Sequence, residues 1–304
     1  MAAQTSIPVI FDTDIGTDID DTWALALILA SPELDLRLVV TDSGDTRTRA
    51  RLAARFLERS GRSDVPVGIG IAGSESLPIA QADWAAGYEL ESYPGVIHED
   101  GVAALIETVR SSAEPVTIIV VGPVANIAEA LRRAPDIVRR ARVVAMSGSV
   151  DRGYVGHTQP DAEYNVRADA AAAREMYRAD WDLLIAPLDT AGQVQLRGDL
   201  YQRLLSVESP MIEALLENYR IWAPRFRWAD HDPDRESSVL YDALAVALVF
   251  EEAFCDIEEV PLEVTDDGFT RRTEGARNVR VALEWQRERS AFEEFLVDRL
   301  SAFE

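Results

Sequence analysis

The chain has 304 residues, 47% hydrophobic and 27% charged, so it can bury a substantial core and has an ordinary globular composition. Its 53 acidic residues face 30 basic ones, all arginine, and the net charge of −23 disfavours binding to nucleic acid or anionic membranes. With one cysteine, Cys255, no basic and apolar leader, and no apolar run near the roughly 20 residues of a membrane span, we expect a cytoplasmic protein.

Apolar runs, separated by residues that end helices and strands, predict alternating elements along the chain. We predict strands at 7–11, 36–40, 65–70, 116–121, 142–146, 182–187, 257–264 and 278–281. We predict helices at 22–30, 48–59, 101–110, 124–133, 168–178, 199–206, 211–219, 239–250 and 290–301. The stretch 71–99 lacks a clear period and is predicted to be a long loop beside a binding cleft.

This alternation predicts an α/β fold with a mainly parallel, Rossmann-like sheet and helices on both of its faces. No repeat or linker divides the chain, so we expect residues 1–304 to form a single domain. In such sheets, ligands bind at the carboxyl ends of the strands. Candidate functional residues are therefore sought just after the predicted strands.

Five aspartates within ten residues follow the first predicted strand: Asp12, Asp14, Asp18, Asp20 and Asp21. Such crowded carboxylates must protonate, turn outward into solvent, or bind a cation. Oxygen ligands favour Ca²⁺ or Mg²⁺ over Zn²⁺, and Gly16 permits the tight turn that a metal-binding loop needs. The alternative is a solvated acidic loop in which Asp20 or Asp21 only caps the next helix.

The run Asp12-Thr13-Asp14-Ile15-Gly16, followed by Asp20-Asp21, resembles the Asp-Thr-Asp-Pro-Gly-x-Asp-Asp motif of the inosine–uridine nucleoside hydrolases. Three later segments are similar to further motifs of that family, in the same order: Gly-Pro-Val-Ala-Asn-Ile-Ala at 122–128, Asp-Ala-Glu-Tyr-Asn at 161–165, and Tyr-Asp-Ala-Leu-Ala-Val at 241–246. The resemblance runs from about residue 7 to the last predicted helix, and four motifs in order make it specific.

The resemblance implies a nucleoside hydrolase-like fold and an enzyme that uses Ca²⁺ to cleave the N-glycosidic bond of a ribonucleoside. The products are the free base and ribose, no organic cofactor is needed, and a homodimer or homotetramer is expected. By the same resemblance, the calcium ligands are Asp14, Asp21, Asp242 and the backbone carbonyl of Ala125. Asp14 also serves as the base that takes a proton from the attacking water.

Further roles follow from the same resemblance. Asp20, Glu163 and Asn165 hold the ribose hydroxyls and stabilise an oxocarbenium-like transition state. His98 matches a family histidine near the ribose or the leaving base, and Met146 lies on the floor of the cleft. For Asn126 we favour a helix-capping role over contact with a ligand.

Two departures from the family pattern concern ribose. The aspartate loop has two extra residues, so Asp18 or Asp20 could face the ribose, and Asp20 is preferred because it adjoins Asp21. Where the family commonly has Gly-Asn after the second strand, this chain has Gly44 followed by Asp45. Asp45 is therefore expected near the substrate, where it could alter sugar recognition.

The third departure concerns the leaving base. Family members often have a histidine just before the late aspartate, but this chain has Tyr241, a weak acid at neutral pH. Protonation of the leaving base then falls to Tyr241, His98, His231 or another residue of the nearby loop. We also predict that Trp222, Phe226 and Trp228 belong to a lid that stacks on the base.

Two alternatives to this function remain. A haloacid-dehalogenase-like, Mg²⁺-dependent phosphatase also begins with a strand and Asp-x-Asp, but it typically needs a lysine, and here Ile15 separates Asp14 from the following Gly-Thr. A non-catalytic ribonucleoside-binding paralogue is disfavoured because the expected base and all three side-chain ligands are retained. The acidic, lysine-free composition indicates either a GC-rich genome or a salt-rich cytoplasm.

Overall fold

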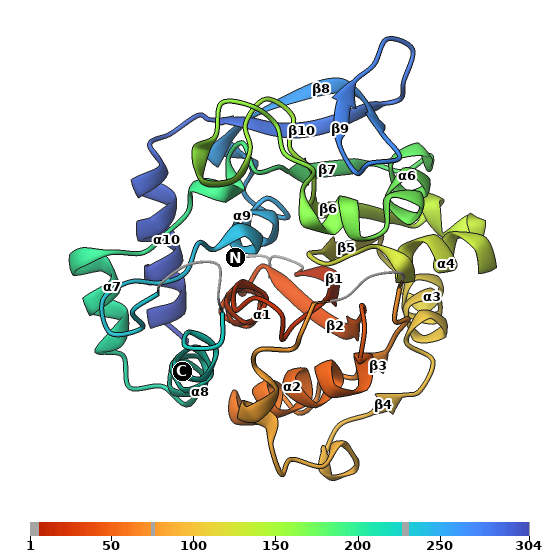
Figure 1. Ribbon diagram of the computed structural model, residues 1–304. Helices are drawn as coiled ribbons and strands as arrows, with labels where there is room; N and C mark the ends of the chain where they lie inside the picture. The colour runs from red at the N-terminus through yellow and green to blue at the C-terminus, as the bar shows by residue number, and fades with distance from the viewer. Residues whose placement is uncertain (1–5, 74–76, 227–230, 304) are drawn as a thin grey trace, which may run out of the picture.

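One mixed sheet organises the molecule in a computed structural model that describes residues 6–73, 77–226 and 231–303 (Figure 1). Within these residues, ten strands lie in the order β4-β3-β2-β1-β5-β6-β7-β10-β8-β9. Their bounds are β1 Ile7–Thr13, β2 Leu34–Thr41, β3 Val67–Ile69, β4 Ile97–His98, β5 Val116–Val120, β6 Ala141–Met146, β7 Leu183–Ala186, β8 Cys255–Val264, β9 Thr270–Arg272 and β10 Asn278–Trp285. From β4 to β10 all neighbours are parallel, and β8 and β9 add antiparallel pairs, which confirms the mainly parallel sheet.

Helices cover both faces of this sheet, as predicted (Figure 1). One face packs against α1 Asp20–Leu29, α2 Thr46–Arg59, α7 Gly198–Leu205, α8 Pro210–Trp222, α9 Tyr241–Ala247 and α10 Arg289–Ser301. The other packs against α3 Gly101–Ser111, α4 Ala125–Arg133 and α6 Ala170–Arg178. Short α5, Tyr164–Ala168, precedes α6. Each face is sealed by its own apolar core, so the central strands β1, β5, β6 and β7 are almost wholly buried.

The order of the strands leaves a crevice at one edge of the sheet. From β1 the chain proceeds to β2, β3 and β4 on one side, and then crosses to β5, β6 and β7 on the other. The loops that leave the carboxyl ends of β1 and β5 therefore diverge, which is where ligands bind in open α/β sheets. Helix α9, from much later in the chain, packs against α1 and β6 beside this crevice.

Several element boundaries differ from the prediction. The first helix begins at Asp20 rather than residue 22, which places two aspartates in its first turn. The helix predicted at 168–178 is interrupted at Asp169, which lies between the end of α5 and the start of α6. The Asp169 side chain caps α6 by accepting a hydrogen bond from the Ala172 amide. The predicted loop 71–99 contains β4 and two short 3₁₀ turns, Ala82–Ala85 and Leu90–Ser92.

Strand β9 was not predicted, because three residues are too few to show a period. It forms since a turn at Gly268, with φ of 81°, folds the chain back onto β8. No helix within the described ranges is long and apolar enough to span a membrane. That residues 1–304 form a single domain stays a prediction.

Candidate active site

A cavity of about 460 Å³ opens at the carboxyl edge of the sheet. Its polar wall is mainly acidic and comprises Asp14, Asp18, Asp20, Asp21, Glu163 and Asp242, joined by Thr17, Asn165 and Ser238. The remaining lining residues, called here the aromatic wall, are mainly aromatic and apolar: Leu77, Val121, Met146, Tyr154, Val155, Tyr164, Phe226, Val239 and Tyr241, joined by Arg167 and His231. The cavity thus combines carboxylates suited to a cation or sugar with flat rings suited to a heterocyclic base.

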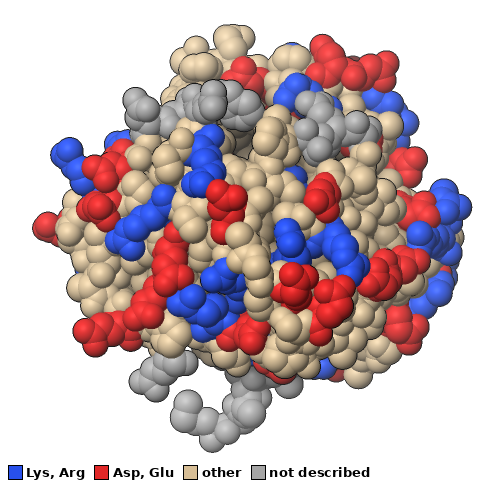
Figure 2. Space-filling model, turned by 60° about the horizontal axis from the view of Figure 1, so that its bottom comes forward, with Lys and Arg blue, Asp and Glu red and all other residues tan. Residues whose placement is uncertain are grey.

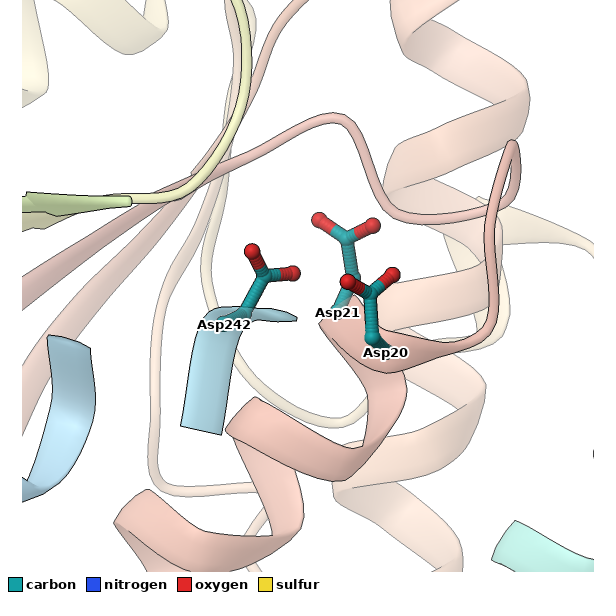
Figure 3. A group of neighbouring side chains, drawn as sticks. All are labelled: Asp20, Asp21 and Asp242. Atoms are coloured by element: carbon teal, nitrogen blue, oxygen red, sulfur yellow. The ribbon is translucent and has the colours of Figure 1, made fainter. Parts of the chain in front are cut away.

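Three carboxylates converge in this cavity. One oxygen from each of Asp20, Asp21 and Asp242 lies within 4.8 Å of the other two. Figure 3 shows that Asp20 and Asp21 rise from the start of α1 while Asp242 comes from α9, and that all three point into the same space. Each lies in the first turn of a helix, where the helix dipole favours negative charge.

This carboxylate group is suited to a hard divalent cation. All three side chains are buried, and burial together with mutual repulsion raises their pKa well above the usual value. In the absence of a counter-charge, the group therefore tends to retain protons. Carboxylate oxygens are the donors that Ca²⁺ and Mg²⁺ prefer, so the donor set and its electrostatics both fit such an ion.

Asp14 lies beside this group, directly after β1. It lines the cavity, and burial raises its pKa while the nearby Arg49 lowers it. The turn after β5 packs closely against it, because a Cβ on Gly122 would lie 2.8 Å from the Asp14 amide nitrogen. Ala125 begins α4 in that turn but is not itself among the residues that line the cavity.

Glu163 and Asn165 form another part of the polar wall. The Glu163 carboxylate accepts hydrogen bonds from the amides of Asn165 at 2.7 Å and Gly148 at 3.0 Å. Burial nevertheless raises its pKa to about 7. The Asn165 amide donates to the carbonyls of Val121 and Met146, at 3.1 and 3.2 Å, which fixes the side chain at the ends of β5 and β6.

The aromatic wall is built around Tyr154 and Tyr241, whose rings meet edge to face at a centroid distance of 6.0 Å. Burial raises the pKa of the Tyr241 phenol, which therefore stays protonated at neutral pH. Phe226 and His231 complete the wall. Trp222 belongs to the core rather than to a lid, because it is fully buried at the end of α8 and stacks on Phe226 at 4.4 Å.

The structure brings together most of the predicted site residues, but His98 and Asp45 do not line this cavity. His98 lies in β4, paired with Gly68 and three strands away from β1. Asp45 is exposed and caps α2, accepting from the amide and hydroxyl of Thr48 at 3.0 and 2.7 Å. The structure thus places these two residues, which the family resemblance had assigned to the site, outside the cavity lining. The predicted lid residue Trp228 lies outside the described residues.

Both candidates for the ribose-facing aspartate line the cavity, since Asp18 and Asp20 are both part of its wall. Asp20, assigned by resemblance to ribose, lies in the carboxylate group with Asp21 and Asp242. The choice between Asp18 and Asp20 stays open.

Asn126 does not cap its helix as predicted. Its amide nitrogen donates to Asp12 at 3.1 Å and to the Thr41 carbonyl at 3.2 Å, and its oxygen accepts from the Ile71 amide at 2.8 Å. Asn126 thereby ties the ends of β1 and β2 to the loop that follows β3. The sequence analysis missed this role because all three partners are distant along the chain.

Two further buried charged residues beside the site were also missed, Asp42 and Arg49. Arg49 shares its helix face with Leu52, Ala53 and Phe56, all of them buried. An arginine at a core-facing position was the available signal. Asp42 follows β2 as Asp14 follows β1, so its position after a strand was a similar signal.

Comparisons with known proteins agree with this geometry. A family model described as inosine-uridine preferring nucleoside hydrolase matches residues 9–292. The chain is 31% identical over 239 residues to the non-specific ribonucleoside hydrolase RihC of Salmonella agona (strain SL483), covering 75% of this chain and 76% of that protein.

Solved structures share the fold. A plant nucleoside hydrolase, the PpNRh1 enzyme, has a TM-score of 0.83 and 24% identity, covering 98% of this chain and 100% of its own. A purine-preferring ribonucleoside hydrolase from Gardnerella vaginalis has a TM-score of 0.80 and 21% identity, covering 97% and 98%.

Proposed function

Because the chain belongs to the inosine-uridine preferring nucleoside hydrolase family, we propose that it hydrolyses the N-glycosidic bond of ribonucleosides, giving free base and ribose. The observation that carries the proposal is one cavity lined both by the carboxylates of Asp14, Asp20, Asp21 and Asp242 and by aromatic side chains. A sugar with an attached flat base matches those two walls. Family membership argues against a haloacid-dehalogenase-like phosphatase.

The proposed cation is Ca²⁺, held by Asp14, Asp21, Asp242 and the carbonyl of Ala125. The clustering of Asp21 with Asp242 supports these two ligands, although the third carboxylate of that group is Asp20 rather than Asp14. The assignment of Asp14 and Ala125 and the choice of calcium over magnesium rest on the family resemblance. When bound, the ion supplies a Lewis acid that makes a water molecule a better nucleophile. The Asp14 carboxylate acts as the base that removes a proton from that water.

On the ribose side, Asp20, Glu163 and Asn165 are proposed to bind the sugar hydroxyls, and Met146 to contact the sugar from the floor of the cavity. Glu163 and Asn165 support this role because protein hydrogen bonds already hold them rigidly. Pre-positioned polar groups stabilise the positive charge that develops on the sugar without reorganising.

At the leaving base, Tyr241 and His231 are proposed as the candidates for proton donation. Both line the cavity, whereas His98 does not. Tyr241 stays protonated at neutral pH and can donate a hydrogen bond to a ring nitrogen of the departing base. The aromatic wall suits either a purine or a pyrimidine, so the base preference is left to experiment.

The test is a reducing-sugar assay over a panel of nucleosides, comparing the protein with its Asp14→Ala variant and with an EDTA-treated sample. Ribose release that both treatments abolish, and that added Ca²⁺ restores after chelation, is the expected result. If phosphate is released from a simple phosphomonoester but no ribose from any nucleoside, the proposal is wrong. Calcium binding without turnover of any nucleoside would favour the non-catalytic ribonucleoside-binding paralogue.

We also propose a homodimer or homotetramer, from the family resemblance, and light scattering of the purified protein will test it. The cytoplasmic location stays a prediction from the sequence.

A further inference from the structure

Arg49 is fully buried beneath the aspartate loop, defined here as residues 14–18. Its guanidinium donates to the carbonyls of Asp14 and Ile15, the latter at 3.1 Å, and to the Thr17 hydroxyl at 2.8 Å. Its Nε donates to the Ser43 carbonyl at 2.6 Å. The Arg49 side chain thus donates hydrogen bonds to the aspartate loop, which contains the proposed catalytic base Asp14, and to the turn after β2.

The loop's backbone oxygens are all held from outside. The Gly16 carbonyl accepts from the Gln81 amide at 3.1 Å, the Thr17 carbonyl from the Trp222 indole at 3.0 Å, and the Asp18 carbonyl from the Gln81 side chain. Together with the two carbonyls bound by Arg49, five consecutive carbonyl oxygens have partners on other elements. We call Arg49, Gln81 and Trp222 the outer clamp.

The outer clamp orients the loop by binding its backbone carbonyl oxygens. Because the carbonyls are engaged by the clamp, the loop presents side chains to the cavity, and Asp14, Thr17 and Asp18 all line it. Gly16, with φ of 119°, makes the turn possible, since an added Cβ would lie 2.7 Å from a Leu52 methyl.

Arg49 also supplies charge without neutralising any single carboxylate. Its acceptors are uncharged oxygens, three carbonyls and one hydroxyl. The guanidinium lowers the pKa of Asp14, Asp21 and Asp42 against the larger effect of burial. An arginine suits this position because its planar fork can bond several oxygens at once, which a lysine ammonium cannot match.

We propose that Arg49 is a positioning residue that holds the aspartate loop in its cation-binding shape before the cation arrives. This inference rests on the metal site of the proposed function. A loop of clustered carboxylates repels itself and would spread in the metal-free protein. With Arg49 in place, the reorganisation that accompanies cation binding is small, and the affinity is correspondingly higher.

The test compares Arg49→Lys with Arg142→Lys. Arg142 is a matched control, because it also donates to a hydroxyl and a carbonyl, on Thr117 and Val249. It is the second residue of β6, at the amino end of the parallel strands, whereas the cavity lies at their carboxyl ends. Calcium affinity is measured by competition with a chromophoric chelator, and stability by thermal unfolding in EDTA. Removing an outer-shell partner of this kind typically weakens metal affinity about 10–100-fold.

We expect Arg49→Lys to weaken Ca²⁺ binding by at least about tenfold, and Arg142→Lys to leave it within a factor of about two of the unaltered protein. In Arg49→Lys, kcat should recover at high Ca²⁺ while KM for the nucleoside stays unchanged. Trp222→Phe removes the indole donor to the Thr17 carbonyl but keeps an aromatic ring. This variant should also weaken calcium binding, and it tests the proposal even if Arg49→Lys does not fold.

If the folded Arg49→Lys and Trp222→Phe variants bind Ca²⁺ like the unaltered protein and only lose stability, as Arg142→Lys does, the positioning role is wrong. If the unaltered protein itself binds no Ca²⁺, the metal site of the proposed function is wrong, and this inference falls with it. The two failures are distinguishable because the unaltered protein is titrated first.

Discussion

Aspartates close together in this chain have different surroundings and therefore different chemistry. Asp12 is buried and hydrogen-bonded by Asn126, Asp14 faces the cavity, and Asp45 is an exposed helix cap. Residue type and spacing alone do not separate these roles, because each of the three lies near the carboxyl end of a strand or in the loop after it. Burial and partners separate them, and substitutions at these positions should differ accordingly.

Asp14→Ala should lower kcat by about 10²–10⁴-fold, since it removes the proposed base while leaving the aromatic wall intact. Asp45→Asn is the matched control, because asparagine caps helices as well as aspartate does and Asp45 lies outside the cavity lining. Steady-state kinetics on one nucleoside will measure both. Equal loss of kcat in the two variants would contradict the assignment of the base.

For the leaving base, Tyr241→Phe and His231→Ala should separate the two candidates. The variant that removes the proton donor should have a kcat lowered by about 10²-fold or more. The other variant should bind the base more weakly, which raises KM with little change in kcat. His98→Ala is expected to leave kcat/KM nearly unchanged because His98 does not line the cavity. A large loss of kcat in His98→Ala would contradict the structural placement.

The carboxylate group predicts how stability depends on pH. Burial raises the folded-state pKa of Asp20, Asp21 and Asp242 well above 3.8, so the folded protein keeps protons that the unfolded chain has released. Stability of the metal-free protein is therefore present at low pH and is lost as pH rises from about 4 through the folded pKa values. Bound Ca²⁺ replaces those protons, so its stabilising effect should grow with pH.

Thermal unfolding between pH 5 and pH 8, with EDTA or with Ca²⁺, will test this dependence. The Tm in EDTA should fall across the series, and the difference between the two conditions should widen. A Tm in EDTA that rises with pH would show that the cluster is not protonated in the folded state.

At the scale of elements, Asn126 joins three segments that meet at the site. In Asn126→Ala, the Ile71 amide, the Thr41 carbonyl and one oxygen of Asp12 lose a buried partner. We expect a loss of about 1–3 kcal/mol in the free energy of unfolding. Urea titration measures it, and Asn278→Ala, whose amide makes a long exposed contact with Glu259, should cost much less.

The sequence could predict most elements because their apolar spacing is set by burial against the sheet. The start of α1 was placed two residues late because Asp20 and Asp21 are polar, yet both lie in a buried first turn. The break at Asp169 was missed because alanines on either side favour one continuous helix. Local pattern cannot reveal a boundary that a capping side chain decides.

For the site, the resemblance identified the residues that line the cavity, including Asp14, Asp20, Asp21, Glu163 and Asp242. It misplaced His98, because the order of motifs along the chain does not show where a short strand joins the sheet. His98 lies in β4, which pairs with β3 at the edge of the sheet. Arg49 and Gln81 escaped attention since their partners lie far away along the chain. Long-range hydrogen bonds of this kind are known only from the fold.

At the scale of the whole molecule, the net charge of −23 leaves a large acidic excess. On the face in Figure 2, arginine and carboxylate side chains lie interspersed over the surface. Many described arginines pair with carboxylates, as Arg47 does with Glu91 and Glu99, and Arg299 with Glu33. Since only 30 arginines face 53 acidic residues, negative charge is in excess, and the carboxylates repel one another.

Added salt should therefore stabilise the protein by screening this repulsion. We expect Tm to rise between about 0.01 M and about 1 M NaCl, over which the screening length falls from about 30 Å to about 3 Å. Loss of structure at the low end would favour adaptation to a salt-rich cytoplasm. A Tm that falls with salt would show that the surface ion pairs outweigh the repulsion.

The contribution of α9 to the cavity has a consequence for how the protein is made. Asp14 and Asp21 leave the ribosome early, but Asp242 emerges only after all seven strands from β1 to β7 and the helices α1 to α8 have been synthesised. A nascent chain that lacks α9 carries crowded carboxylates with no closed site to hold an ion. Capture of the proposed cation therefore belongs to the end of synthesis, and a chain truncated before residue 242 should gain no stability from calcium.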